Sequence, residues 1–350
     1  MSSASAQFDA SEQRYLATLR FAVAGTSTFL VCELMQWTPT FLAPVLAVVL
    51  LGNLPGRPPP KAIVALVLVT AVAALGSFVL ASLLQDIPIL LVGAIALGAF
   101  LCFHSIAKGR PAFPALLTLI CLATIPVVVM VAPAQAGALP AALIRGIALA
   151  MVIVWIVHTL WPVAQNSAQP PPAPPASPVI TPFMRALVSV IVVVPMMLVY
   201  LLFGWADVLP VLVATVMLVV TFDAQRSRLQ ALAMVIGNFA GGFLGLFLYG
   251  VLSIAPGLWL LGLLIFTMLL VYGRGIAKGG PAAGVLLIAC NATLIILGSA
   301  IATGPAPLSL WLARLFQFAI AGAFSVATMS LFWHYYTLKR IAPRSVEVPN

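Results

Sequence analysis

Acidic side chains are scarce in this sequence, and charged residues of either sign are few. Seven of the 350 residues are Asp or Glu, and charged residues together make up 7% of the chain, whereas 63% of the residues are hydrophobic. A soluble chain of this length cannot keep its surface hydrated with so few charges. The shortage of charge therefore argues against a soluble globular protein and predicts a polytopic membrane protein.

Cysteine motifs and catalytic motifs are also missing. The four cysteines lie in apolar segments without a CxxC pair, which favours apolar packing over a metal or redox site (Cys32, Cys102, Cys121 and Cys290). The sequence has no Walker A motif, no metal-ligand spacing and no paired carboxylates, so we expect neither an enzyme nor a bound cofactor. The polar stretch from Met1 to Gln13 has no basic n-region, so we expect no cleaved signal peptide.

Long apolar segments make up most of the sequence. Six precede a proline-rich stretch and six follow it, and most are long enough to cross a hydrocarbon core of about 30 Å as helices. We therefore predict an all-α membrane protein with about twelve transmembrane helices. The expected helices cover Tyr15–Trp37, Pro39–Leu54, Ala62–Leu84, Pro88–Ala107, Pro111–Ala132, Ala138–Trp161, Phe183–Trp205, Val208–Phe222, Leu229–Leu252, Pro256–Ala277, Pro281–Thr303 and Leu308–Tyr335.

A seven-residue stretch occurs twice and indicates an internal duplication. Ile106–Ala112 reads IAKGRPA and Ile276–Ala282 reads IAKGGPA, so six of seven residues are identical across a spacing of 170 positions. Each copy separates two apolar runs, which predicts a tight basic turn between two helices. We expect a first six-helix repeat over residues 1–162, a proline-rich cytoplasmic linker over 163–182, a second six-helix repeat over 183–336 and a cytoplasmic tail over 337–350.

The sixteen basic residues are spread over short segments, which predicts an orientation in the membrane and no nucleic-acid partner. In a twelve-helix arrangement one side receives Glu33, Asp86 and Asp207 and the other side receives most of the cations. The positive-inside rule then places both termini in the cytoplasm, and six helices per unit make the two repeats parallel. The cations on the cytoplasmic side are Arg14, Arg57, Lys61, Lys108, Arg110, Arg185, Arg226, Arg228, Arg274, Lys278, Lys339, Arg340 and Arg344.

The two halves also match outside the repeated turn. Among the matched pairs are Arg20 with Arg185, Trp37 with Trp205, Pro44 with Pro210, Lys108 with Lys278, and Arg145 with Arg314. Three glycines four residues apart in the ninth expected helix, Gly237, Gly241 and Gly245, predict a ridge for close helix packing.

Intramembrane arginines are the strongest signal for a site. Arg145 and Arg314 each lie about 10 Å inside the last helix of their half, where a permanent charge is costly unless it faces a polar cavity or extends to the membrane surface. Two counterparts at matched positions favour a shared anion pathway. At the inner end, Arg20, Arg185, Lys108 and Lys278 would form a basic vestibule, with binding to lipid headgroups as the alternative for the two lysines.

Two short expected helices carry a proline each. Pro44 and Pro210 lie in the second and eighth expected helices, and paired short or interrupted helices are typical of transport sites. We expect both prolines to kink their helices and shape a constriction, the alternative being an ordinary kink without a role in transport. No Asp or Glu lies near the middle of any apolar run, although proton-coupled transporters usually carry such a group.

The segments around these residues resemble a known family. Leu19-Arg20, Trp37, the run Phe41-Leu-Ala-Pro44-Val-Leu and the Asn53-Leu-Pro55 turn are similar to the fusaric acid resistance / aromatic acid exporter superfamily, closest to its short members catalogued as a domain of unknown function. The resemblance implies a bacterial inner-membrane exporter of aromatic carboxylic acids. It also implies a periplasmic membrane-fusion adaptor and an outer-membrane channel as partners.

The sequence therefore predicts a transporter that exports organic anions. Arg145 and Arg314 would attract a carboxylate at the outer face, and Arg20 and Arg185 would do so at the inner face. A passive anion channel is one alternative, supported by the missing intramembrane carboxylate. A non-transporting membrane scaffold for an adaptor protein is another. Membrane lipid is an expected partner, and a homo-oligomer is left open.

Overall fold

The computed structural model describes residues 2–54, 56–162, 181–203 and 227–304, together with single positions between 316 and 331. Within these ranges all regular structure is helical. The helices are α1 (Ser2–Leu34), α2 (Leu42–Asn53), α3 (Pro60–Leu84), α4 (Pro88–Ala107), α5 (Ala112–Val131), α6 (Pro133–Ala136), α7 (Ala138–Leu160), α8 (Pro182–Phe203), α10 (Ser227–Ile254), α11 (Leu258–Ala277) and α12 (Pro281–Thr303).

Nine helices in the described part of the chain are long and apolar enough to cross a membrane. The prediction of an all-α membrane protein is thereby confirmed. The described helices begin and end within a few residues of the predicted bounds, except that α1 extends to Ser2 and the four-residue α6 was not predicted. The expected helix at Val208–Phe222 lies outside the described residues, as do nearly all of the proline-rich linker and the whole tail. Of the expected helix at Leu308–Tyr335 only single positions between 316 and 331 are described, and these positions are helical.

The outward faces of several helices are apolar, as lipid contact requires. On α3 the exposed residues Val64, Leu68, Val72 and Leu75 recur at the three- and four-residue intervals of one helical face. The opposite face of α3 buries Thr70, Ala74, Ser77 and Ala81. Apart from Leu66, which is also buried, large side chains of α3 therefore face outward and small ones face the neighbouring helices, the arrangement expected where lipid replaces water.

Both copies of the repeated stretch form the predicted turn. Gly109 has φ 79° and Gly279 has φ 74°, which is left-handed backbone that glycine adopts without steric cost. The N–H of Gly109 donates to the carbonyl of Ile106, and the N–H of Gly279 donates to the carbonyl of Ile276, each at 2.9 Å. The Lys-Gly pair that both copies share therefore ends a helix at each of the two places, with a left-handed glycine.

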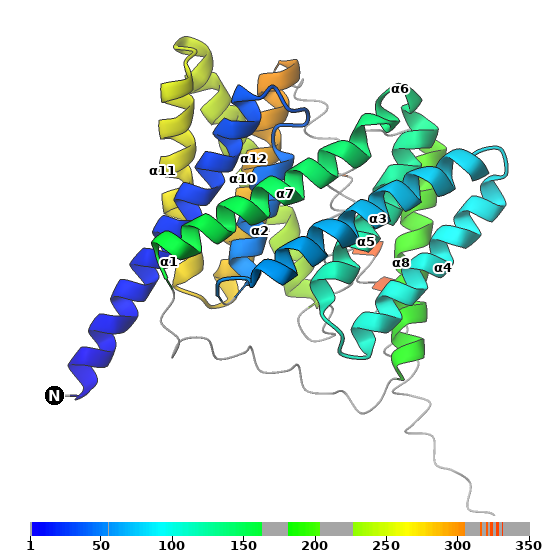
Figure 1. The fold of residues 1–350 in the computed structure, drawn as a ribbon, viewed down its shortest axis with the longest axis horizontal. Helices are drawn as coiled ribbons and strands as arrows, with labels where there is room; N and C mark the ends of the chain where they lie inside the picture. Colours follow the sequence, from blue (N-terminus) through cyan, green and yellow to red (C-terminus); the bar gives the residue numbers. More distant parts are fainter. Residues whose placement is uncertain are drawn as a thin grey trace, which may run out of the picture.

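Helices from the two halves of the sequence pack against each other reciprocally (Figure 1). The first helix, α1, lies along α11, which precedes the second copy of the turn, and α8 lies along α4, which precedes the first copy. Within each half, α3 packs on α5 as α10 packs on α12. One core cluster joins Phe21 and Phe29 of α1 to Ile265 and Leu269 of α11, so burial is shared between the halves.

The glycine ridge on α10 packs directly against α12, as predicted. A methyl group at Gly241 would overlap the carbonyl oxygen of Ala289, and one at Gly245 would lie 3.0 Å from the carbonyl oxygen of Thr293. The close approach lets the Thr293 hydroxyl donate to the Gly241 carbonyl at 3.0 Å, while Tyr272 of α11 lies 3.2 Å from the same hydroxyl. The ridge therefore serves helix packing.

Candidate functional site

A turn at the end of α1 positions Trp37. The chain leaves the helix through Gln36, whose φ of 55° is left-handed. The N–H of Gln36 donates to the carbonyl of Glu33 at 3.1 Å, and the N–H of Trp37 donates to the carbonyl of Cys32 at 2.9 Å. This is the Schellman pattern, in which the residue after the left-handed position packs back on the last helical turn. It holds the Trp37 indole over Cys32.

The helix α2 starts shortly after this turn and carries Pro44 in its first turn. The structure contradicts the predicted kink at Pro44, because Pro44 is the third residue of α2. A first-turn residue has no intrahelical partner for its N–H, so proline costs no hydrogen bond there. At twelve residues, about 18 Å, α2 is shorter than the predicted helix. Prolines do lie inside two other described helices, Pro126 in α5 and Pro195 in α8.

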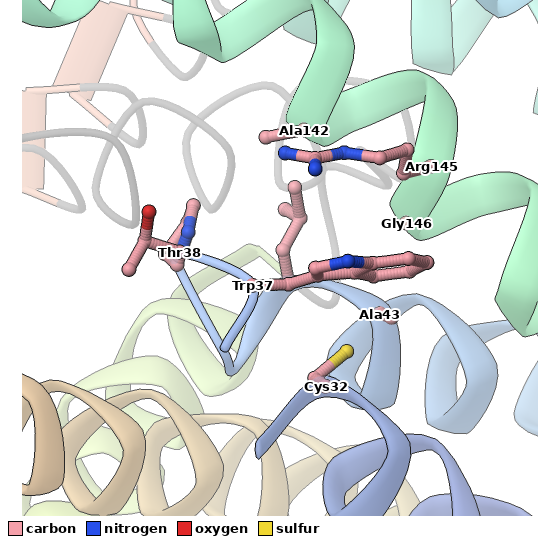
Figure 2. A pocket seen from close by; sticks show the side chains of 9 residues that line it. Cys32, Trp37, Thr38, Ala43, Ala142, Arg145 and Gly146 are labelled. Carbon is pink, nitrogen blue, oxygen red and sulfur yellow. The ribbon is translucent and has the colours of Figure 1, made fainter. Parts of the chain in front are cut away.

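Arg145 is the eighth residue of α7 and lies over the face of Trp37. The guanidinium carbon is 5.2 Å from the centroid of the indole, and Nε donates to the carbonyl of Ala141 at 3.3 Å. Figure 2 shows the Arg145 side chain reaching from α7 along one face of Trp37, with Cys32 on the other face. The side chain is exposed, and no carboxylate pairs with it within the described ranges.

A shallow hollow opens beside this pair, at what we call the Arg145 end of the bundle (Figure 2). It is small and partly open to its surroundings. A cation, an aromatic face, a thiol and a hydroxyl border it among apolar residues. The lining residues are Cys32, Trp37, Thr38, Pro39, Leu42, Ala43, Ala142, Arg145 and Gly146. Such a surface suits a small anion with an apolar or aromatic part.

Arg20 occupies a different setting from the one expected of a vestibule residue. Only 6% of its side chain is exposed, and its guanidinium donates to the carbonyl of Trp161 at 3.2 Å. Trp161 follows the last residue of α7, where carbonyl groups lack helical partners and carry partial negative charge. Arg20 thus caps α7 and ties it to α1, while a part for Arg20 in an anion pathway stays a prediction.

The other predicted site residues are spread over the molecule. Arg185 is exposed on α8, and since α8 lies along α4 rather than α1, the structure does not bring Arg185 next to Arg20. Lys108 and Lys278 are exposed in the two repeated turns. Pro210 and Arg314 lie outside the described residues.

The sequence interpretation missed Trp37 as a site residue. The signal was present, because Trp37 and Arg145 both have a match in the second half, Trp205 and Arg314. Two matched residues of complementary chemistry favour a contact between them. Glu33 was used only to predict the orientation in the membrane. One carboxylate oxygen of this side chain is buried without a hydrogen-bond partner in the structure.

Fold and site together define a polytopic helical membrane protein with an unpaired arginine in a surface hollow. Residues 17–157 match the model of a family described as "Protein of unknown function (DUF2955)". The match runs from α1 into α7 and leaves the second half of the chain uncovered. No curated protein and no solved structure matches the sequence.

Proposed function

We propose that the protein exports organic anions, with aromatic carboxylic acids as the substrate class. The observation that carries the proposal is Arg145, an exposed guanidinium in a membrane helix that lies over Trp37 and has no acidic partner among the described residues. An arginine in the apolar region of a membrane is costly, and the cost is reduced when an anion approaches it.

The chemistry of the pair suits an aromatic acid. A guanidinium presents several N–H donors in one plane and binds a carboxylate with two parallel hydrogen bonds. Trp37 keeps the guanidinium in place through its ring face, and the apolar residues that line the hollow offer surface for a substrate ring. The hollow is open to one side, which fits a site that anions enter and leave rather than one that encloses them.

The proposed architecture has twelve helices in two parallel six-helix repeats. Three observations support it: both repeated turns have a left-handed glycine after the lysine, α1 on α11 mirrors α8 on α4, and the family match covers about one expected repeat. We place the protein in a bacterial inner membrane with both termini cytoplasmic, so that the Arg145 end faces outward. The resemblance to the aromatic acid exporter superfamily supports this placement and a periplasmic adaptor as partner.

The test is efflux of radiolabelled benzoate from proteoliposomes. We expect saturable efflux from the wild type and at least a tenfold loss of kcat/KM in Arg145→Ala/Arg314→Ala. Arg145→Lys should keep part of the flux, because lysine retains the charge but not the planar fork. Arg110→Ala, which changes an exposed cation in the first repeated turn, is the matched control. Equal flux in all variants would make these arginines lipid anchors.

A passive anion channel is the second candidate. In the apolar parts of the described membrane helices the only acidic residue is Glu33, and it lies at the end of α1. A proton-coupled carrier usually has a carboxylate deeper in the membrane. Efflux that continues unchanged after a protonophore collapses the pH gradient, and that follows the membrane potential alone, would favour the channel.

A further inference from the structure

A second arginine–tryptophan contact lies at the opposite end of the same helix pair. The guanidinium carbon of Arg57 is 4.3 Å from the centroid of the Trp155 ring. Arg57 lies in the segment between α2 and α3, and Trp155 lies in the last two turns of α7.

The two contacts are related through α2 and α7, which run in the same direction. Leu42 at the start of α2 packs on Gly146 of α7, and Arg57 just after the end of α2 meets Trp155. Along both helices, the Trp37–Arg145 contact therefore lies before the stretch in which α2 packs on α7, and the Arg57–Trp155 contact lies after it. Arg145 and Trp155 are ten residues apart, about 15 Å along the helix. Each end of the α2–α7 pair thus holds one guanidinium over one indole.

The Arg57 end has unused hydrogen-bond donors. Arg57 is exposed, and its guanidinium makes no hydrogen bond or ion pair in the part of the chain that the structure describes. The indole Nε1–H of Trp155 is buried and has no acceptor either. Buried N–H groups nearly always have an acceptor, so this N–H is a donor that an incoming acceptor beside the cation could satisfy.

We propose that Arg57 and Trp155 form a second oxyanion site, which takes the carboxylate of the transported aromatic acid at the other end of the α2–α7 pair. The inference rests on the proposed function for the identity of its ligand. Attraction to the ring face holds the Arg57 guanidinium without using directed N–H bonds, so the donors remain for a carboxylate. The neighbouring Pro58, Pro59 and Pro60 restrict the backbone and keep the arginine near the ring.

The same N–H groups could also donate to the phosphate of an anionic lipid headgroup, and the experiment separates the two sources. The protein is placed in nanodiscs of zwitterionic phosphatidylcholine, and its tryptophans are labelled with ¹⁵N. The Trp155 indole N–H resonance is identified by its loss in Trp155→Phe, which keeps an aromatic ring but removes the N–H. Sodium benzoate is titrated in one series, and the fraction of phosphatidylglycerol is raised in another.

We expect a saturable benzoate-dependent shift of the Trp155 resonance in the wild type. Arg57→Ala should weaken the apparent affinity at this site about tenfold or more, since a charge-assisted hydrogen bond is lost. Arg110→Ala should leave the titration unchanged. A shift that follows phosphatidylglycerol but not benzoate, or no shift with either, would overturn the proposal.

Flux separates this proposal from the proposed function. In oriented proteoliposomes Arg57→Ala should raise KM at least several-fold for benzoate presented at the Arg57 end, with little change for benzoate presented at the Arg145 end. Normal efflux without a Trp155 shift would refute the second site and leave the transport function intact. A saturable Trp155 shift in a protein that transports no acid would support the oxyanion site and refute transport.

Discussion

At the scale of single residues, two arginines with similar sequence surroundings have opposite settings. Arg145 is exposed and has one weakly held backbone partner and one aromatic neighbour. Arg20 is buried and caps the end of α7 by donating to the carbonyl of Trp161. Both cations lie in membrane helices, but only Arg145 leaves most of its donors available to a ligand. The proposed function therefore rests on Arg145, which has no acidic partner among the described residues.

The first prediction concerns Arg20 and its sequence counterpart Arg185. Arg20→Ala should lower the free energy of unfolding by about 2 kcal/mol, because it removes a charge-assisted hydrogen bond to a helix end. Arg185→Ala, at an exposed position on α8, should change stability by less than about 0.5 kcal/mol. Thermal unfolding of both variants in the same detergent measures the difference. Equal destabilisation would show that the capping contact contributes nothing.

At the scale of elements, helix endings and small-residue faces decide how the helices meet. Gln36 occupies a left-handed position that glycine occupies in the repeated turns, and it aims Trp37 back over α1. The α10 ridge shows the other device, where absent side chains let a neighbouring backbone come close enough to accept a hydroxyl hydrogen bond. In both cases a local backbone feature determines which side chains can touch.

The second prediction compares two glycines of α10. Gly241→Ala should destabilise the protein by about 1–3 kcal/mol, because its methyl group would overlap the α12 backbone at Ala289. Gly250→Ala, with no atom near the added methyl group, should cost nothing. The readout is the midpoint of thermal unfolding, followed by size-exclusion chromatography. A Gly241→Ala protein as stable as the wild type would mean that α10 and α12 can separate freely.

At the scale of the whole molecule, the two halves of the sequence are not independent bodies. The first half packs α1 against α11 of the second half, and the second half packs α8 against α4 of the first. Core clusters contain residues of both halves at these contacts. Each half alone would expose these apolar faces to its surroundings. The family match to residues 17–157 covers α1 and α4 but neither of the helices, α11 and α8, that pack against them.

The third prediction tests the contact between α1 and α11 by disulfide formation. An added Cβ at Gly273 of α11 would lie 3.3 Å from the Cβ of Phe21 in α1, close to the spacing of about 3.8 Å in disulfides. Phe21→Cys/Gly273→Cys, in a background without the native cysteines, should crosslink under mild oxidation. A protease site introduced in the linker then reports the bond, because the crosslinked halves stay together on a non-reducing gel. Phe21→Cys/Gly257→Cys is the control, as Gly257 lies at the far end of α11. Crosslinking in the control alone would refute the packing.

Much of the fold could be predicted from the sequence, because a segment that crosses the hydrocarbon core must be apolar, long enough and helical. Apolar length predicted the helices, and α4 and α12 begin and end at the predicted residues. The Lys-Gly turns and the glycine ridge were also predicted correctly, since glycine patterns have few backbone solutions. The kink at Pro44 was predicted wrongly, because the effect of a proline depends on where its helix begins, and the turn that delays the start of α2 follows from hydrogen bonds around Gln36.

The sequence alone determined that this protein is helical, lies in a membrane and carries a repeated basic turn, because composition and short-range backbone preferences suffice for those conclusions. Only the tertiary structure decided that Arg20 is capped by a backbone carbonyl while Arg145 is exposed. Trp37 and Arg145 are 108 positions apart, and Arg20 and Trp161 are 141 apart, so their contacts depend on how α1, α2 and α7 pack. A long-range contact is a property of packing, and no local pattern distinguishes a buried capping arginine from an open one.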